Sequence, residues 1–233
     1  MSTIKKSAIA SAEQQLEPLA AASSAYNQIN SFSHQYDRGG NLTVNGKPSF
    51  SVDQAATQLL RDGAAFKDLN GNGKIDLSYT FLTSASSSTM YKHGISGFSQ
   101  FSAQQKAQAV LAMQSWADVA NVVFTEKASG GDARMTFGNY SGGQDGAAAF
   151  AYLPGTGAGY DGTSWYLINS SYTQNKNPDL NNYGRQTLTH EIGHTLGLAH
   201  PGDYNAGEGN PSYKDASYGQ DTRGYSIMSY WSE

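Results

Sequence analysis

The chain has 233 residues, enough for one domain with a substantial hydrophobic core. It contains no cysteine, which excludes disulfides, cysteine-ligated metal clusters and a cysteine nucleophile. The net charge is -4, from 15 Lys+Arg against 19 Asp+Glu, and no basic run is present, so we expect no nucleic-acid partner.

The N-terminal segment is rich in Ala and Ser and has no clear apolar period up to about residue 20. Polar residues interrupt it before any apolar stretch reaches the length of a secretory signal, and no apolar run in the chain approaches ~18 residues. We therefore expect no Sec-type signal and no membrane span. The predicted domains are a leader over residues 1–18 and a single domain over residues 19–233, with a lobe boundary near residue 198.

Capping boxes at Ser51–Gln54 and Ser102–Gln105 predict two helices, over about residues 52–62 and over about residues 103–120. A third helix is predicted over about residues 183–196. Alternating apolar residues predict a half-buried strand over residues 75–82. Shorter strand-like segments follow at residues 122–125, 134–137, 148–153 and 165–168. From Gly197 onward the sequence predicts irregular structure.

The segment Asp68–Asp76 resembles the first nine positions of an EF-hand loop, including the glycine at the sixth position. The twelfth position is Tyr79 in place of glutamate, and a strand is predicted where the second helix would begin. Two interpretations remain open at this point: a calcium-binding loop, or a turn that leads into a strand.

The informative motif is H-E-x-x-H-x-x-G-x-x-H, with histidines at His190, His194 and His200. His190 and His194 are one helical turn apart and share a helix face, about 6 Å apart along the axis. A continued helix would place His200 about 15 Å from His190, so the helix must end first, and Gly197 is suited to that turn. Two ligands from a helix and a third from the returning chain fit one zinc ion.

Glu191 lies beside the first ligand, and three protein ligands leave a fourth zinc position open for water. This is the pattern of a catalytic site, in which a carboxylate takes a proton from the activated water and passes it to a leaving amine. We therefore expect Glu191 to be the general base. On the predicted helix, Leu188, Ile192 and Leu196 lie opposite the histidines, so one face is buried and the other faces a cleft.

The full motif is the metzincin signature, and the segment Ser226–Trp231 resembles the methionine turn that follows it in that group. Together with His200–Gly207, Gln114–Ala120 and Ala149–Pro154, it resembles the serralysin family of secreted bacterial zinc endopeptidases. The resemblance covers about residues 20–233. It implies an α+β fold: a twisted, mostly parallel sheet with helices in the N-terminal lobe and a small irregular C-terminal lobe.

The resemblance also implies roles for individual residues. Met228 would form a hydrophobic floor below the histidines, and Tyr230 would be a switchable zinc ligand that later stabilises the oxyanion. A further hypothesis is that Asp203 orients a ligand histidine. An extended substrate would add to an edge strand, whose residues are Ala149, Phe150, Ala151 and Tyr152.

The same resemblance implies one catalytic Zn²⁺, protein or peptide substrates, a proteinaceous inhibitor as a further partner, a monomer, and type I-like export to the extracellular space. The resemblance further implies that the leader is a propeptide. Serralysins continue beyond the methionine turn into a calcium-binding repeat domain, so we expect a C-terminally truncated chain and calcium mainly in a longer one. The rival interpretation is a non-catalytic module stabilised by zinc or calcium, which would not need Glu191 or Tyr230.

Overall fold

The structure, a computed structural model, describes residues 24–34, 36–143 and 147–232. The chain divides into two compact units, Met1–Gly39 and Gly40–Glu233. In the described part of the first unit, helix α2 spans Ser24–His34. The leader predicted over residues 1–18 lies outside the described residues.

The second unit is built around a five-stranded sheet with the order β5-β3-β6-β9-β8. Strand β3 pairs in parallel with both β5 and β6, β6 pairs in parallel with β9, and only β8 within this sheet runs antiparallel to its neighbour. The predicted mostly parallel sheet and α+β class are confirmed. The strands are β3 (Ile75–Phe81), β5 (Val122–Glu126), β6 (Ala133–Tyr140), β8 (Ala149–Ala151) and β9 (Thr163–Leu167).

Both predicted capping boxes are formed. Ser51 and Ser102 each accept a hydrogen bond from the backbone of the residue three positions later, and that residue's glutamine side chain caps the serine N–H in return. The first helix is three residues shorter than predicted, and the second also ends three residues early. The helices of this unit are α3 (Val52–Leu59), α4 (Ser87–Lys92), α5 (Ala103–Ala117), α6 (Thr173–Lys176) and α7 (Tyr183–Thr195).

The described residues also contain two small two-stranded sheets. In the first, residues Asn45 and Gly46 connect the strands with φ of 51° and 74°, the positive pair that a tight type I′ hairpin turn needs. The second pairs two strands far apart in the sequence. These strands are β1 (Thr43–Val44), β2 (Lys47–Pro48), β4 (Ile95–Ser96) and β7 (Gly142–Gly143).

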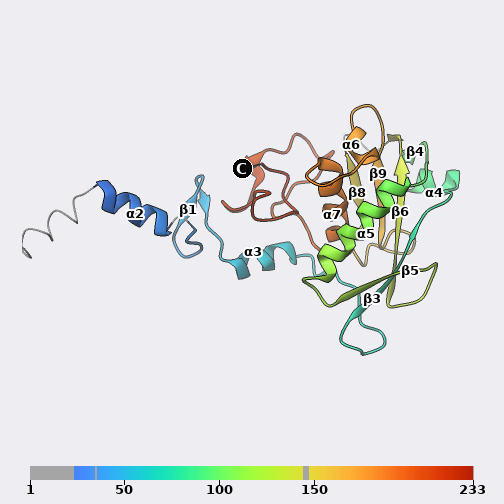
Figure 1. Cartoon of the computed structure of the whole chain (residues 1–233), viewed down its shortest axis with the longest axis horizontal. Helices are drawn as coiled ribbons and strands as arrows, with labels where there is room; N and C mark the ends of the chain where they lie inside the picture. The colour runs from blue at the N-terminus through green and yellow to red at the C-terminus, as the bar shows by residue number, and fades with distance from the viewer. Residues whose placement is uncertain (1–23, 35, 144–146, 233) are drawn as a thin grey trace, which may run out of the picture. The chain divides into compact units, whose positions relative to one another are not determined.

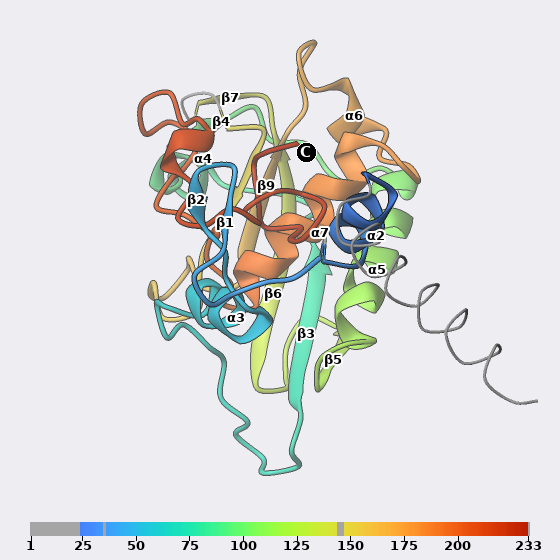
Figure 2. The same cartoon turned by 90° about the vertical axis from the view of Figure 1, so that its left-hand side faces the viewer.

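Helices α5 and α7 lie side by side against one face of the sheet (Figures 1 and 2). Leu188 and Ile192 of α7 are buried in the main core, and Leu196 is packed against it. The predicted apolar face of the motif helix is therefore confirmed. Because the apolar face of α7 packs on the core, the opposite face, which carries the histidines, points away from the core.

The chain from residue 196 to residue 212 contains no helix or strand, and a short 3-10 turn follows at Tyr213–Asp215. The prediction of an irregular C-terminal region is thus confirmed. Residues 40–233 form one compact unit, so the lobe boundary near residue 198 stays a prediction. Within the described part of the chain, no helix is both long and apolar enough to cross a membrane.

The EF-hand-like loop turns directly into β3. Asp68 accepts backbone hydrogen bonds from Gly71 and Gly73 at 2.7 and 2.8 Å, and the amides of Asn70 and Asn72 both donate to Asp76. A strand therefore takes the place of the second helix of an EF-hand. The loop is held by its own side chains, as the turn interpretation predicts, and calcium binding remains a prediction.

Candidate metal centre

The three histidines of the motif converge on one point. Their Nε2 atoms lie 3.0 to 3.1 Å from one another, although His200 is ten residues from His190. Among the described residues, these three form the group that could hold a metal ion. Helix α7 supplies His190 and His194, and the irregular chain after it returns His200 to the same face.

The return depends on Gly197. Its φ is +107°, and α7 ends just before it at Thr195. The Gly197 N–H donates to the His194 carbonyl, and the Leu198 N–H donates to the Gly193 carbonyl, at 2.9 and 3.0 Å. These two bonds form a Schellman motif. The glycine break predicted from the sequence is confirmed.

A backbone carbonyl holds the second nitrogen of each imidazole. The Nδ1 atoms of His190, His194 and His200 bond to carbonyls at 2.9, 2.7 and 2.7 Å. Carbonyls only accept, so each Nδ1 carries the proton and each Nε2 has a free lone pair. The three carbonyls belong to Ile227, Leu198 and Tyr204, respectively.

This arrangement fits a tetrahedral metal site. Three unprotonated nitrogens cannot hydrogen-bond to one another, so only a cation can satisfy all three. A zinc ion with Zn–N bonds of about 2.05 Å sets its ligand nitrogens about 3.3 Å apart, close to the spacing found here. Burial is the largest cause of a lowered pKa at two of these histidines. The pKa of His194 falls to about 4 and that of His200 to about 3, so both are neutral at pH 7.

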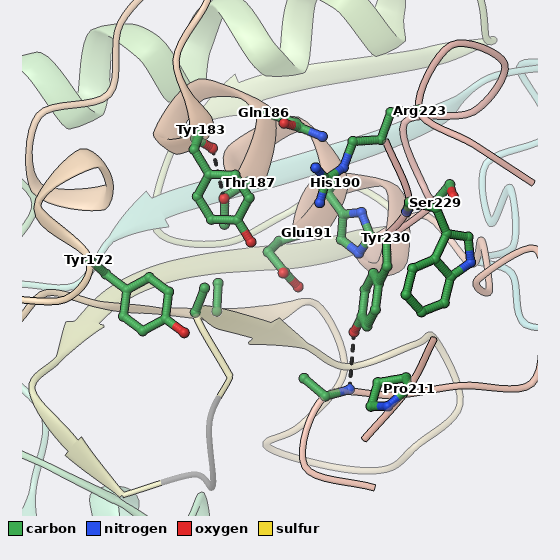
Figure 3. Close-up of a pocket in the computed structure, with 14 residues that line it drawn as sticks. Tyr172, Tyr183, Gln186, Thr187, His190, Glu191, Pro211, Arg223, Ser229 and Tyr230 are labelled. Atoms are coloured by element: carbon green, nitrogen blue, oxygen red, sulfur yellow. Dashed lines mark hydrogen bonds between the residues drawn. The ribbon is translucent and has the colours of Figure 1, made fainter. Parts of the chain in front are cut away.

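Glu191 is buried beside the first histidine. Its Oε2 atom is without a hydrogen-bond partner among the described residues, and burial raises the pKa of its carboxyl to about 8. An unpaired buried carboxylate is costly, so such a group indicates function more than stability. Figure 3 shows Glu191 directed into the centre of a pocket, between Tyr183 and Tyr230.

The predicted methionine turn lies against the motif helix. Met228 is 1% exposed, and a Cβ added to Gly193 would come within 2.5 Å of its Sδ atom. Ser226 closes the turn by accepting a bond from the Ser229 N–H at 3.1 Å. The turn therefore packs on α7 and also presents the Ile227 carbonyl to His190.

Tyr230 extends from this turn across the pocket (Figure 3). Its ring centroid lies 4.5 Å from that of His200 and 5.9 Å from that of His190. Its hydroxyl oxygen accepts a hydrogen bond from the Ala206 N–H at 3.1 Å. The structure therefore brings Tyr230 to the histidines, with its phenol oxygen bonded to the backbone.

A cleft runs past the histidines along β8. One pocket, of about 280 Å³, is lined by Glu191 and Tyr230, and a second, of about 360 Å³, adds Phe150 and Ala151. Strand β8 is one of the two edge strands of its sheet. Tyr152 follows the strand, and its hydroxyl meets His93 Nδ1 at 3.2 Å, so its side chain is engaged outside the two pockets.

Asp203 does not occupy the position expected of it. It is exposed at the rim of the second pocket, and the ligand-orienting contacts come from carbonyls instead. Two residues that no sequence motif marks support His200. Tyr204 stacks on its ring at 5.2 Å and 14°, and donates its hydroxyl hydrogen to the fully buried Asp221 at 2.8 Å.

The sequence profile of the matrixin family, Peptidase_M10, matches residues 85–207, which is more than half of the chain. The chain belongs to this metallopeptidase family, and its fold is that of a matrixin-type metzincin. The family implies a catalytic zinc ion, and the three-histidine group fits one.

Within this group the serralysin resemblance is confirmed. The chain is 82% identical over 233 residues to Metallopeptidase AprA of Pseudomonas marginalis, covering 100% of this chain and 47% of the relative. It is 51% identical over 224 residues to Serralysin C of Dickeya chrysanthemi, covering 94% of this chain and 46% of the relative. The chain thus spans about half the length of these curated relatives.

The solved structure of myroilysin is a more distant match. It shares 15% sequence identity with this chain, with a TM-score of 0.35, and the match covers 73% of this chain and 56% of that one. At this similarity it adds nothing to the assignment.

Proposed function

We propose that the chain is the catalytic part of a zinc-dependent endopeptidase that hydrolyses internal peptide bonds of proteins. One observation carries the proposal: three unprotonated Nε2 atoms converge beside a buried carboxylate that lacks a hydrogen-bond partner among the described residues. The high identity to a metallopeptidase and to serralysins supports the same activity. A non-catalytic metal module would gain nothing from an unpaired buried Glu191.

The roles follow from the positions. His190, His194 and His200 would hold the zinc, which when bound polarises a water molecule and lowers its pKa toward about 7. Glu191 would accept a proton from this water at its free Oε2 and donate it to the departing amine. With zinc present, the nearby positive charge favours the carboxylate form that a base needs.

The surroundings would bind and orient the substrate. Strand β8 offers its outer edge to an extended peptide, which would pair with Ala149–Ala151 as an added strand. Tyr230, close to the histidines, would exchange its bond to the Ala206 N–H for one to the developing oxyanion. Met228 would support the metal site from below through Gly193.

Wider properties are part of the same proposal. The serralysin relationship supports protein substrates, export to the extracellular space by a type I-like route, and residues 1–18 as a propeptide. It also supports a monomer, a proteinaceous inhibitor as a partner, and calcium as an additional ion of a longer chain.

The test combines zinc content with proteolysis. The purified chain should contain one zinc per molecule and cleave casein, and a chelator should abolish cleavage. Glu191→Gln should retain zinc and lose about 10²- to 10⁴-fold in rate, the usual contribution of a general base. Glu126→Gln, an exposed position on β5, is the matched control and should behave as the unaltered chain. One bound zinc without proteolysis would favour the non-catalytic module.

A further inference from the structure

The loop that carries His200 rests on a distant part of the chain, the segment that follows α3. The Leu59 carbonyl, at the end of α3, accepts a hydrogen bond from the Ala199 N–H at 2.8 Å. Ala64 also touches this loop, because a Cβ added to Gly197 would come within 2.0 Å of the Ala64 carbonyl oxygen. Figure 2 shows α3 beside the end of α7 from which this loop departs.

Arg61 lies in the middle of this contact. Its Nη1 donates to the carbonyl of His200, and its Nη2 donates to the carbonyl of Gly202 at 3.1 Å. The same Nη1 also donates to the Gln58 carbonyl at 3.0 Å, which fixes the guanidinium on its own helix end. The planar guanidinium therefore bridges two carbonyls on either side of Pro201, a geometry that its rigid fork of donors suits.

His200 needs such support more than the other two histidines do. His190 and His194 are placed by the backbone hydrogen bonds of α7, whereas the chain from residue 196 to residue 212 has no helix or strand. Tyr204 orients the ring of His200 through Nδ1 but belongs to the same irregular stretch. A fixed backbone position at His200 therefore depends on contacts from elsewhere, and Arg61 supplies two of them directly.

We propose that Arg61 is a positioning residue for the metal site, which holds the backbone of His200 so that its Nε2 meets those of His190 and His194. The proposal rests on the zinc site of the proposed function but not on peptide hydrolysis. Arg61 acts through geometry and against its own charge. A guanidinium near the site repels a dication, so a purely electrostatic role predicts tighter zinc binding when it is removed.

The experiment measures zinc affinity by competition with a chromophoric chelator, in the folded chain of residues 1–233. Arg61→Ala should bind zinc about 10- to 100-fold more weakly, the usual effect of losing a group that orients a ligand. Arg61→Lys, which can reach one carbonyl but lacks the fork, should fall between. Cobalt in place of zinc should give an altered visible spectrum in Arg61→Ala, because the third nitrogen is displaced.

Arg134→Ala is the matched control. Arg134, on β6, makes one exposed bond from its Nη2 to Thr80 Oγ1 at 3.0 Å and lines neither of the two pockets beside the histidines. It should leave zinc affinity and the cobalt spectrum unchanged. If Arg61→Ala does not fold, Arg61→Gln, which keeps one amide donor, replaces it as the test variant, with the same two measurements of zinc affinity and cobalt spectrum.

Equal or tighter zinc binding in folded Arg61→Ala or Arg61→Gln, with an unchanged cobalt spectrum, would overturn the proposal. This outcome is distinct from a failure of the proposed function. If the proposed function were wrong, the unaltered chain itself would bind no zinc, or would bind zinc without cleaving casein.

Discussion

Gly193 is the position at which the motif helix and the methionine turn touch, and Gly193→Ala should separate them. An added Cβ would lie 2.5 Å from Met228 Sδ and 2.9 Å from Trp116 Cζ2. Ordinary contact distances are about 3.4 to 4 Å, so both neighbours must move. The methionine tip can rotate, but the indole is held by a bond from Trp116 Nε1 to the Thr189 carbonyl at 3.0 Å.

Two opposing effects set the magnitude of this change. Alanine is favoured over glycine inside a helix by about 1 kcal/mol. Overpacking a tight contact costs about 1–3 kcal/mol. Because one neighbour is a fixed ring, we expect a cost of about 2–3 kcal/mol, which leaves a net loss of about 1–2 kcal/mol in the free energy of unfolding. Zinc affinity should fall as well, since the displaced turn carries the Ile227 carbonyl that orients His190.

Urea unfolding and chelator competition measure these two effects. A double-mutant cycle with Met228→Ala separates the two neighbours, because removing the methionine side chain should relieve the contact with Sδ but not the contact with Trp116. The coupling should exceed about 0.5 kcal/mol. The reasoning is refuted if Gly193→Ala alone is more stable than the unaltered chain and binds zinc equally well.

Two further predictions concern the turn after the helix and the metal-free site. Gly197→Ala should destabilise the chain by at least about 2 kcal/mol in urea unfolding, because φ is +107° at this position and a Cβ would collide with the Ala64 carbonyl. A loss below about 0.5 kcal/mol would contradict this prediction. In the metal-free chain, folding lowers the pKa of His194 and His200, so both histidines take up protons on unfolding below pH 6.5. The free energy of unfolding should therefore fall from pH 6.5 toward about pH 4, by up to about 1.4 kcal/mol per pH unit for each histidine. Glu191 has a raised pKa of about 8, so its contribution to stability is lost as pH rises from 4.5 to 8. The free energy of unfolding, measured in a chelator, should therefore be highest near pH 6.5. A free energy of unfolding that rises steadily from pH 5 to pH 8 would contradict this prediction.

The sequence was informative where the determining interactions are local. The capping boxes at Ser51 and Ser102 act within four residues, and both helices begin where predicted. Gly197 could be assigned because the spacing of three ligands demands a chain reversal there. Helices α4 and α6 were missed because six and four residues are too short to show a helical period.

The support of the site could not be predicted in this way. Arg61 bonds to a carbonyl 139 residues away, and His190 receives its carbonyl from a residue 37 positions later. Backbone carbonyls carry no side-chain signature, so no motif marks them. The hypothesis of an orienting Asp203 names a side chain, whereas the group bonded to His200 Nδ1 is the main-chain carbonyl of Tyr204.

The three carbonyls that hold the imidazoles have a consequence for the order in which the protein matures. Two come from the loop that follows α7 and the third from the methionine turn, so no single segment can prepare the site. An unfolded chain would offer zinc only loosely tethered imidazoles of mixed tautomer. High affinity should therefore arise late, once residues 190 to 228 have come together. Metal capture would then report that folding is finished.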